Sequence, residues 1–169
     1  TGRATELLDG LVGEIGEAGG TARAFPLDVT EAAGVRAAVA AVEETLGPIG
    51  ILVNNSGIAI TKPFLKFEES DWDRVMDTNL KGAWLVAREV AERMVAHARG
   101  GKIINIASIG ASVALGQLSA YCVSKAGIAH LTRTMAVELA RYDIQVNAIA
   151  PGYVETDMNR DFFATSGGK

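Results

Sequence analysis

The chain has 169 residues, of which 49% are apolar, which is enough for one domain with a hydrophobic core. Its net charge is −4 with acidic and basic residues interspersed, so we expect no nucleic-acid partner. The apolar runs are too short to span a membrane, the single cysteine excludes an internal disulfide framework, and no cluster of histidine or cysteine indicates a metal site.

The N-terminal part of the chain alternates helical and strand patterns. These patterns predict a helix over 5–18, a strand over 22–28, a helix over 31–46 and a buried strand over 49–55. Gly19 and Gly20 end the first helix, and Pro26 lies within the first strand. Thr30 is the expected N-cap of the second helix.

The C-terminal part continues the same alternation with longer helices. We predict a helix over 71–98, a strand over 102–108, a helix over 119–141 and a strand over 144–150. Ser70 is the expected N-cap of the first of these, with Asp73 completing a capping box. The strands are apolar on both faces, which favours an α/β fold with a parallel sheet covered by helices on each side. No repeat or linker divides the chain, so residues 1–169 are expected to form one domain.

Tyr121 and Lys125 are four residues apart, so their side chains emerge from the same helix face. An ordinary tyrosine keeps its proton to about pH 10, and a neighbouring cation favours the phenolate. A hydroxyl from a separate segment, Ser108, would hold a substrate oxygen beside the phenol. Together with Asn79, these residues indicate proton transfer to and from a carbonyl or alcohol oxygen, although a tyrosine and a lysine at this spacing also occur on helices without function.

Six motifs occur in an order that resembles the short-chain dehydrogenase/reductase family. They are Asp28-Val29, Asn54-Asn55-Ser56-Gly57, Asn79 in DTNLKG, Ser108 in NIAS, Tyr121 and Lys125 in YCVSK, and the run from Pro151 to Thr156. The chain is most similar to 3-oxoacyl-[acyl-carrier-protein] reductases and related bacterial ketoreductases. The resemblance implies a Rossmann-like doubly wound sheet and hydride exchange between NAD or NADP and a ketone or secondary alcohol.

The resemblance also implies a role for each catalytic residue. Tyr121 is the acid in reduction and the base in oxidation. Lys125 lowers the pKa of that tyrosine and binds the ribose hydroxyls of the cofactor, while Ser108 holds the substrate oxygen. The amide of Asn79 anchors a water that connects Lys125 to solvent. The alternative for Asn79 is a polar side chain that bonds to nearby backbone.

A second set of residues is implied in cofactor binding. Its members are Asp28 and Val29 at the adenine, Asn54 and Gly57 after the next strand, Tyr121 and Lys125 at the ribose, and Pro151, Gly152, Val154 and Thr156 around the nicotinamide. Asn54 and its neighbour Asn55 would tie adjacent strands together, and Gly57 would let backbone approach the cofactor closely. The alternatives are a strand-end turn for Asp28 and an ordinary loop for the last segment.

The chain departs from the family at its N-terminus, where the TGxxxGxG phosphate-binding fingerprint is missing. Thr1-Gly2 matches its first two letters, but Glu6 and Leu8 occupy positions that need glycine. We therefore expect residues 1–169 to lack the first two strands and the C-terminal strand of the family sheet. The two absent strands would leave a gap of about 10 Å in the sheet, so independent folding is not expected. Arg3 would follow the second family strand and is a candidate partner for a 2′-phosphate.

Three further expectations concern assembly, location and an alternative function. The helices over 71–98 and 119–141 carry apolar residues beyond one stripe, such as Trp84 and Val123, and family members pair such helices in dimers or tetramers. We therefore expect a homo-oligomer, unless these side chains pack within the subunit.

Cys122 is interpreted as a small buried side chain, and one cysteine is typical of a reducing compartment, so we expect a cytoplasmic protein. The alternative function is a non-catalytic scaffold on the same fold.

Overall fold

The computed structural model describes residues 1–154. Its helices are α1 (Thr5–Glu17), α2 (Ala32–Leu46), α3 (Glu69–Met76), α4 (Gly82–His97) and α5 (Ser119–Leu139), and its strands are β1 (Ile51–Asn54), β2 (Gly101–Ile106) and β3 (Ile144–Ile149). Short 3₁₀ turns occur at Phe64–Lys66, Ile109–Ala111 and Ala140–Tyr142, and a π-helical turn occurs at Asp77–Lys81. No helix among the described residues is both long and apolar enough to cross a bilayer.

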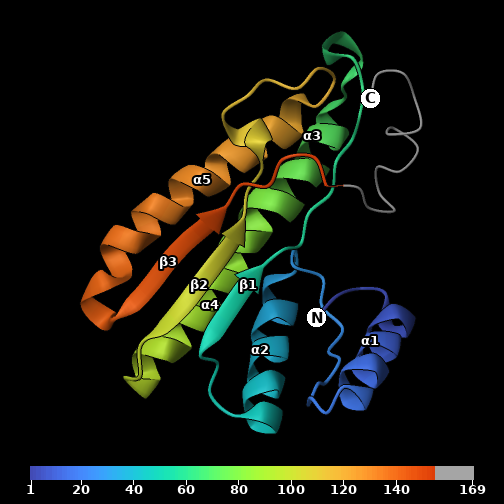
Figure 1. Cartoon of the computed structure of the whole chain (residues 1–169). Helices are drawn as coiled ribbons and strands as arrows, with labels where there is room; N and C mark the ends of the chain where they lie inside the picture. The colour runs from blue at the N-terminus through green and yellow to red at the C-terminus, as the bar shows by residue number, and fades with distance from the viewer. Residues whose placement is uncertain (155–169) are drawn as a thin grey trace.

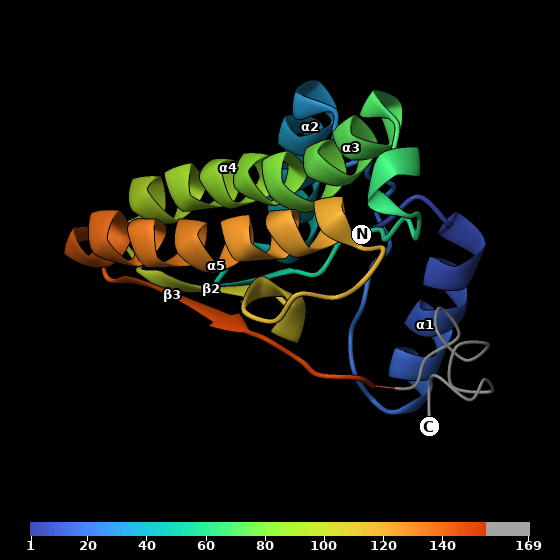
Figure 2. The ribbon, with the colours of Figure 1, turned by 90° about the horizontal axis from the view of Figure 1, so that it is seen from above.

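The three strands form a parallel sheet in the order β1-β2-β3 (Figure 1). Asn54 at the end of β1 pairs with Asn105 of β2, and Ile106 at the end of β2 pairs with Ile149 of β3. Helices α4 and α5 lie side by side along one side of these strands (Figure 2). The predicted α/β class, a Rossmann-like parallel sheet flanked by helices, is therefore confirmed.

The core lies between the sheet and the helices on that side. Side chains at most 5% exposed come from α2 (Val35, Val39), from α4 (Val90, Met94) and from the centre of β2 (Ile103). The small β-branched residues of α2 and the unbranched Met94 fill this space closely. The core therefore fixes the positions of α2 and α4 along the strand direction. Their N-terminal ends lie toward the carboxyl ends of the strands (Figure 1).

Two strand expectations are wrong in detail. Residues 22–28 form no strand, only a single parallel bridge between Gly2 and Pro26. Pro26 has no N–H to donate, and among the described residues the backbone of this segment bonds to a separate stretch of chain only at Gly2. β1 was expected to be buried on both faces, but Ile51 and Val53 are 61% and 53% exposed because no described helix covers that face of β1.

The helix starts also differ from the expected caps. α2 has Glu31 at its N-cap, and Thr30 instead donates its hydroxyl to Asp28 Oδ1 at 2.7 Å. α3 begins two residues earlier than expected, with Glu68 rather than Ser70 at the N-cap. Its capping partner is Asp71, not Asp73, because the buried Asp71 carboxylate accepts from the Glu68 N–H at 3.2 Å and is paired with a lysine, Lys62, at 2.5 Å.

The long helix expected over 71–98 is interrupted. The π-helical turn at Asp77–Lys81 separates α3 from α4 and places one extra residue in the helical spiral. Gly82 follows it, and a Cβ there would lie 2.6 Å from Val29 Cγ2. Glycine is thus required where α4 crosses the segment that precedes α2.

Replacing Gly82 tests this close contact. We expect Gly82→Ala to lower the free energy of unfolding by about 1–3 kcal/mol, because its methyl group would overlap Val29. Gly10→Ala in the middle of α1 is the matched control, since nothing lies within 4 Å of its Cβ position. That change should raise stability by about 0.5–1 kcal/mol. Urea unfolding of the intact protein measures both values, and equal effects at the two sites would contradict this packing.

Candidate functional site

A cleft of about 190 Å³ opens at the carboxyl ends of the three strands. It is lined by Asn55, Gly57, Ile58, Ile106, Ala107, Ser108, Tyr121, Lys125, Pro151 and Gly152. These residues come from the end of β2, from the connections after β1, β2 and β3, and from the first turns of α5. Ligands of open parallel α/β sheets bind at this edge, so the cleft is the candidate site.

Backbone pairing beyond the strands brings two of these connections together. The Ala107 N–H donates to the Ile149 carbonyl at 2.8 Å, and the Ile109 N–H donates to the Pro151 carbonyl at 2.9 Å. These bonds continue the β2–β3 ladder past the end of both strands. They place Ser108 beside the Pro151-Gly152 turn at the base of the cleft.

Lys125 is a buried cation beside the ring of Tyr121. Its residue is 6% exposed, and Nζ lies 5.7 Å from the centroid of the Tyr121 ring. Nζ donates to the Ile106 carbonyl at 2.7 Å, which fixes the ammonium over the end of β2. Burial lowers the pKa of Lys125 from its ordinary value, because the charged form loses water.

Ser108 follows β2 in an extended conformation and is 8% exposed. Its Oγ accepts from the Gly110 N–H at 3.1 Å, which holds the side chain in place. Among the described residues, the Ser108 hydroxyl has no hydrogen-bond acceptor of its own. That proton is therefore available to an oxygen atom bound in the cleft.

Asn79 lies in the π-helical turn and is 1% exposed. Its Oδ1 accepts from the Ile58 N–H at 2.8 Å, and its Nδ2 donates to the Ile58 carbonyl at 2.9 Å and to Ser124 Oγ at 3.0 Å. Both amide hydrogens are used by these protein partners. Asn79 therefore holds the backbone at the cleft, and its anchoring of a water near Lys125 stays a prediction.

The cleft has features that suit a nicotinamide dinucleotide. A Cβ on Gly57 would lie 3.4 Å from Asn79 Oδ1 and 3.6 Å from Lys125 Nζ, so glycine leaves bare backbone beside the buried cation. The Lys125 ammonium has one hydrogen bond among the described residues, which leaves two N–H groups for sugar hydroxyls. The residues present therefore fit the ribose and nicotinamide end of the cofactor, with Pro151 and Gly152 on the adjoining wall.

Other residues of the implied cofactor set lie outside the cleft lining. Asn54 donates through Nδ2 to Asn105 Oδ1 at 3.0 Å and to the Ala83 carbonyl at 3.1 Å, so it ties β1 to β2 and to α4. Val154 is 60% exposed beyond the Pro151-Gly152 turn. Thr156 lies outside the described residues.

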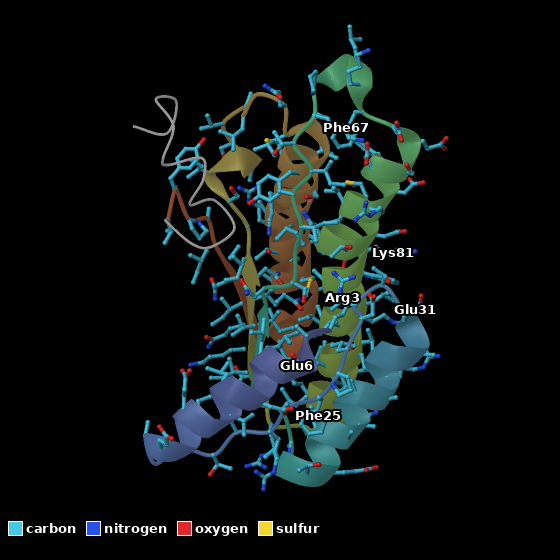
Figure 3. The ribbon with its side chains drawn as sticks, turned by 90° about the vertical axis from the view of Figure 1, so that its right-hand side faces the viewer. Arg3, Glu6, Phe25, Glu31, Phe67 and Lys81 are labelled. Carbon is cyan, nitrogen blue, oxygen red and sulfur yellow. The ribbon has the colours of Figure 1, made fainter. Side chains whose placement is uncertain are left out.

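Asp28 and Val29 lie before α2, away from the cleft. Asp28 Oδ1 accepts from the backbone N–H and the hydroxyl of Thr30, at 3.0 and 2.7 Å, and these bonds lower the pKa of the Asp28 carboxyl. Figure 3 labels Arg3, which lies just before α1. Its Nη1 is 3.8 Å from the second Asp28 oxygen. The Val29 side chain is buried in the core, so only its backbone is free to meet a ligand.

Sequence reasoning missed three residues that shape the cleft. Asn55 lines the cleft, whereas the sequence indicated only a strand-tying role for it. Ile58 acts through its backbone, so no side-chain pattern could reveal it. Ser124 directly precedes Lys125, but its bond to Asn79 joins residues 45 positions apart. No group of three or more metal-ligating side chains gathers anywhere in residues 1–154.

Comparison with known proteins gives a consistent result. A family model described as short chain dehydrogenase matches residues 1–167. The 5-keto-D-gluconate 5-reductase of Escherichia coli K12 is 42% identical over 137 residues, which cover 81% of this chain and 54% of that protein. The galactitol 2-dehydrogenase of Agrobacterium fabrum is 44% identical over 137 residues, again covering 81% and 54%.

A solved structure shares this arrangement of helices and strands. The crystal structure of a gluconate 5-dehydrogenase from Burkholderia cenocepacia, in complex with NADP and tartrate, is 39% identical with a TM-score of 0.92. The match covers 98% of this chain and 65% of that one. The chain thus spans between about half and two thirds of the length of these relatives.

The buried ammonium predicts a pH dependence of stability. Because the pKa of Lys125 is lowered in the folded state, the unfolded chain binds more protons between that lowered value and 10.5, and stability rises with pH across this interval. Lys125→Met removes this contribution. The unfolding free energy of the variant minus that of the wild type should therefore fall from about pH 7 to about pH 10. Lys66→Met, at an exposed lysine, is the control, and a constant difference for Lys125→Met would contradict the prediction.

Proposed function

The chain belongs to the short-chain dehydrogenase family, and from this premise we propose that it carries the catalytic site of an oxidoreductase acting on secondary alcohols and ketones. The cofactor is NAD or NADP, and residues 1–169 contribute part of one nicotinamide-binding domain. The observation that carries the proposal is that Ser108, Tyr121 and Lys125 line one cleft at the carboxyl ends of the parallel strands. A scaffold without activity would have no need of a buried ammonium beside a phenol.

The proposed mechanism assigns proton handling to the protein. In reduction, the Tyr121 hydroxyl gives its proton to the carbonyl oxygen, and in oxidation the phenolate takes the proton of the alcohol. The Lys125 ammonium lies beside the Tyr121 ring and binds sugar hydroxyls through its two remaining N–H groups. The Ser108 hydroxyl donates to the substrate oxygen and holds it near the phenol. When bound, the nicotinamide supplies or accepts the hydride.

The substrate class that we propose is a polyol or sugar acid. The relatives named above act on 5-keto-D-gluconate and galactitol, and a further relative, from Mycolicibacterium smegmatis, is a D-threitol dehydrogenase 39% identical over 153 residues. These substrates share a secondary alcohol or ketone flanked by hydroxyls. A 3-oxoacyl thioester, suggested by the resemblance of the motifs, is the second candidate.

Tyr121→Phe tests the catalytic assignment, because it keeps the ring and removes the proton donor. We expect the intact wild-type protein to oxidise NADPH or NADH with 5-keto-D-gluconate, and the variant to lose at least about a hundredfold in kcat. Thr45→Val, at an exposed position of α2 outside the cleft, also removes one hydroxyl and is the control that should keep wild-type turnover. Near-normal turnover by Tyr121→Phe would overturn the assignment. Acetoacetyl thioester in the same assay decides between the two substrate candidates.

We also propose that the protein is a cytoplasmic homo-oligomer that pairs through α4 and α5. A groove of about 380 Å³ runs between these helices and is lined by Trp84, Arg88, Met135 and Tyr142, among others. Trp84 on α4 and Val123 on α5 are 43% and 46% exposed in the isolated chain. Exposed aromatic and aliphatic side chains on these two helices suit a second copy of the same surface.

Trp84→Glu tests this assembly. The charged side chain should shift the intact protein to smaller species in light scattering at micromolar concentration, since burying an unpaired carboxylate at an interface is unfavourable. Leu65→Glu, at the 92% exposed position of the Phe64–Lys66 turn, is the control. A wild-type monomer at this concentration would contradict the proposal.

A further inference from the structure

Ser124 is completely buried and makes two hydrogen bonds that join different parts of the site. Its Oγ accepts from Asn79 Nδ2 at 3.0 Å and donates to the Tyr121 carbonyl at 2.7 Å. The first partner lies in the π-helical turn, and the second is the backbone of the proposed acid and base. Ser124 therefore connects Asn79 to the helical turn that carries Tyr121 and Lys125.

The connection continues to the wall of the cleft. Asn79 holds the Ile58 peptide on both sides, through its N–H and its carbonyl. Ile58 lines the cleft next to Gly57, where bare backbone faces the Lys125 ammonium. One continuous series of hydrogen bonds thus runs from the loop after β1, through Asn79 and Ser124, to Tyr121.

The proton count of Ser124 gives this series a direction. A serine hydroxyl has one proton, and here it is donated to the Tyr121 carbonyl, so Oγ can only accept from Asn79. The amide nitrogen of Asn79 must therefore face Ser124, and Oδ1 is left to accept from the Ile58 N–H. Ser124 thereby determines which way the Asn79 amide points.

From this geometry we infer that Ser124 is a positioning residue for the reaction proposed above, on which this inference rests. It sets the distance of Tyr121 and Lys125 from the loop at Gly57 and Ile58. Without the hydroxyl, a buried N–H of Asn79 would have no acceptor, and the amide would shift or turn. The helical turn that carries Tyr121 and Lys125 would then no longer be joined by hydrogen bonds to the loop at Ile58. The ammonium and the phenol would move relative to a bound substrate.

The same helix contains a matched control. Thr132, eight residues further along α5, accepts from Asn105 Nδ2 at 2.9 Å and donates to the Ile128 carbonyl at 2.7 Å. It is also buried, at 6% exposure. The bonding pattern is the same as that of Ser124, but neither Thr132 nor its two partners line the cleft. Thr132→Val therefore removes an equivalent buried hydroxyl that has no proposed link to the reaction.

The experiment compares Ser124→Ala with Thr132→Val in the intact protein. Both should unfold at lower urea concentration, because each leaves a buried amide N–H without its acceptor. Only Ser124→Ala should lower kcat, by about ten- to a hundredfold, and change the pH profile of kcat, because a displaced ammonium alters proton transfer at the phenol. Thr132→Val should keep its kcat and pH profile.

A second variant covers the case in which Ser124→Ala does not fold. Ser124→Cys keeps a weak donor and acceptor and should give an intermediate kcat. Equal kcat and pH profile for the folded Ser124 variant and Thr132→Val would overturn the inference while leaving the proposed function intact. Turnover by Tyr121→Phe equal to that of the wild type would instead overturn the proposed function.

Discussion

Parallel pairing of β1, β2 and β3 is the constraint on which the site depends. Parallel strands end at the same edge of a sheet, so the chain must leave all three at one place. The pairing continues past the strands through the Ala107 and Ile109 N–H groups, which brings Pro151 beside Ser108. Tyr121 and Lys125 join them because α5 packs along the strands with its first turns at this edge (Figure 2).

Buried polar side chains fix the position of the helices on this frame. Asn54 and Asn105 join neighbouring strands and bond to α4 and α5. In a second set of bonds, Asn79 and Ser124 join the π-helical turn to α5. Apolar packing alone allows small sliding of a helix on a sheet, whereas hydrogen bonds between fully buried groups tolerate little error. Of these two sets of bonds, only that of Asn79 and Ser124 reaches residues that line the cleft, so we assign to it the precision that proton transfer requires.

The sequence predicted the parts of the molecule whose signals are local. Apolar runs identified β1, β2 and β3, and the four-residue spacing placed Tyr121 and Lys125 on one helix face. The strand over 22–28 failed because a strand needs partners, which no local pattern reports. The π-helical turn at Asp77–Lys81 contains neither glycine nor proline, so its amino-acid sequence does not distinguish it from a regular α-helix. The bonds of the Asn79 amide to Ile58 and Ser124 could not be predicted because these partners are distant in sequence.

The π-helical turn sets the relative phase of the two helices that it joins. An α-helix advances by about 100° per residue, so a single additional residue rotates everything after it by that amount. The inward-facing positions of α3 therefore need not continue at regular helical spacing into α4. Val75 of α3 and Val90 of α4 are both buried. Loss of one residue from this turn would restore regular helical geometry and turn the inward face of α4 toward solvent. The segment is consequently less tolerant of a change in length than of many changes in side chain.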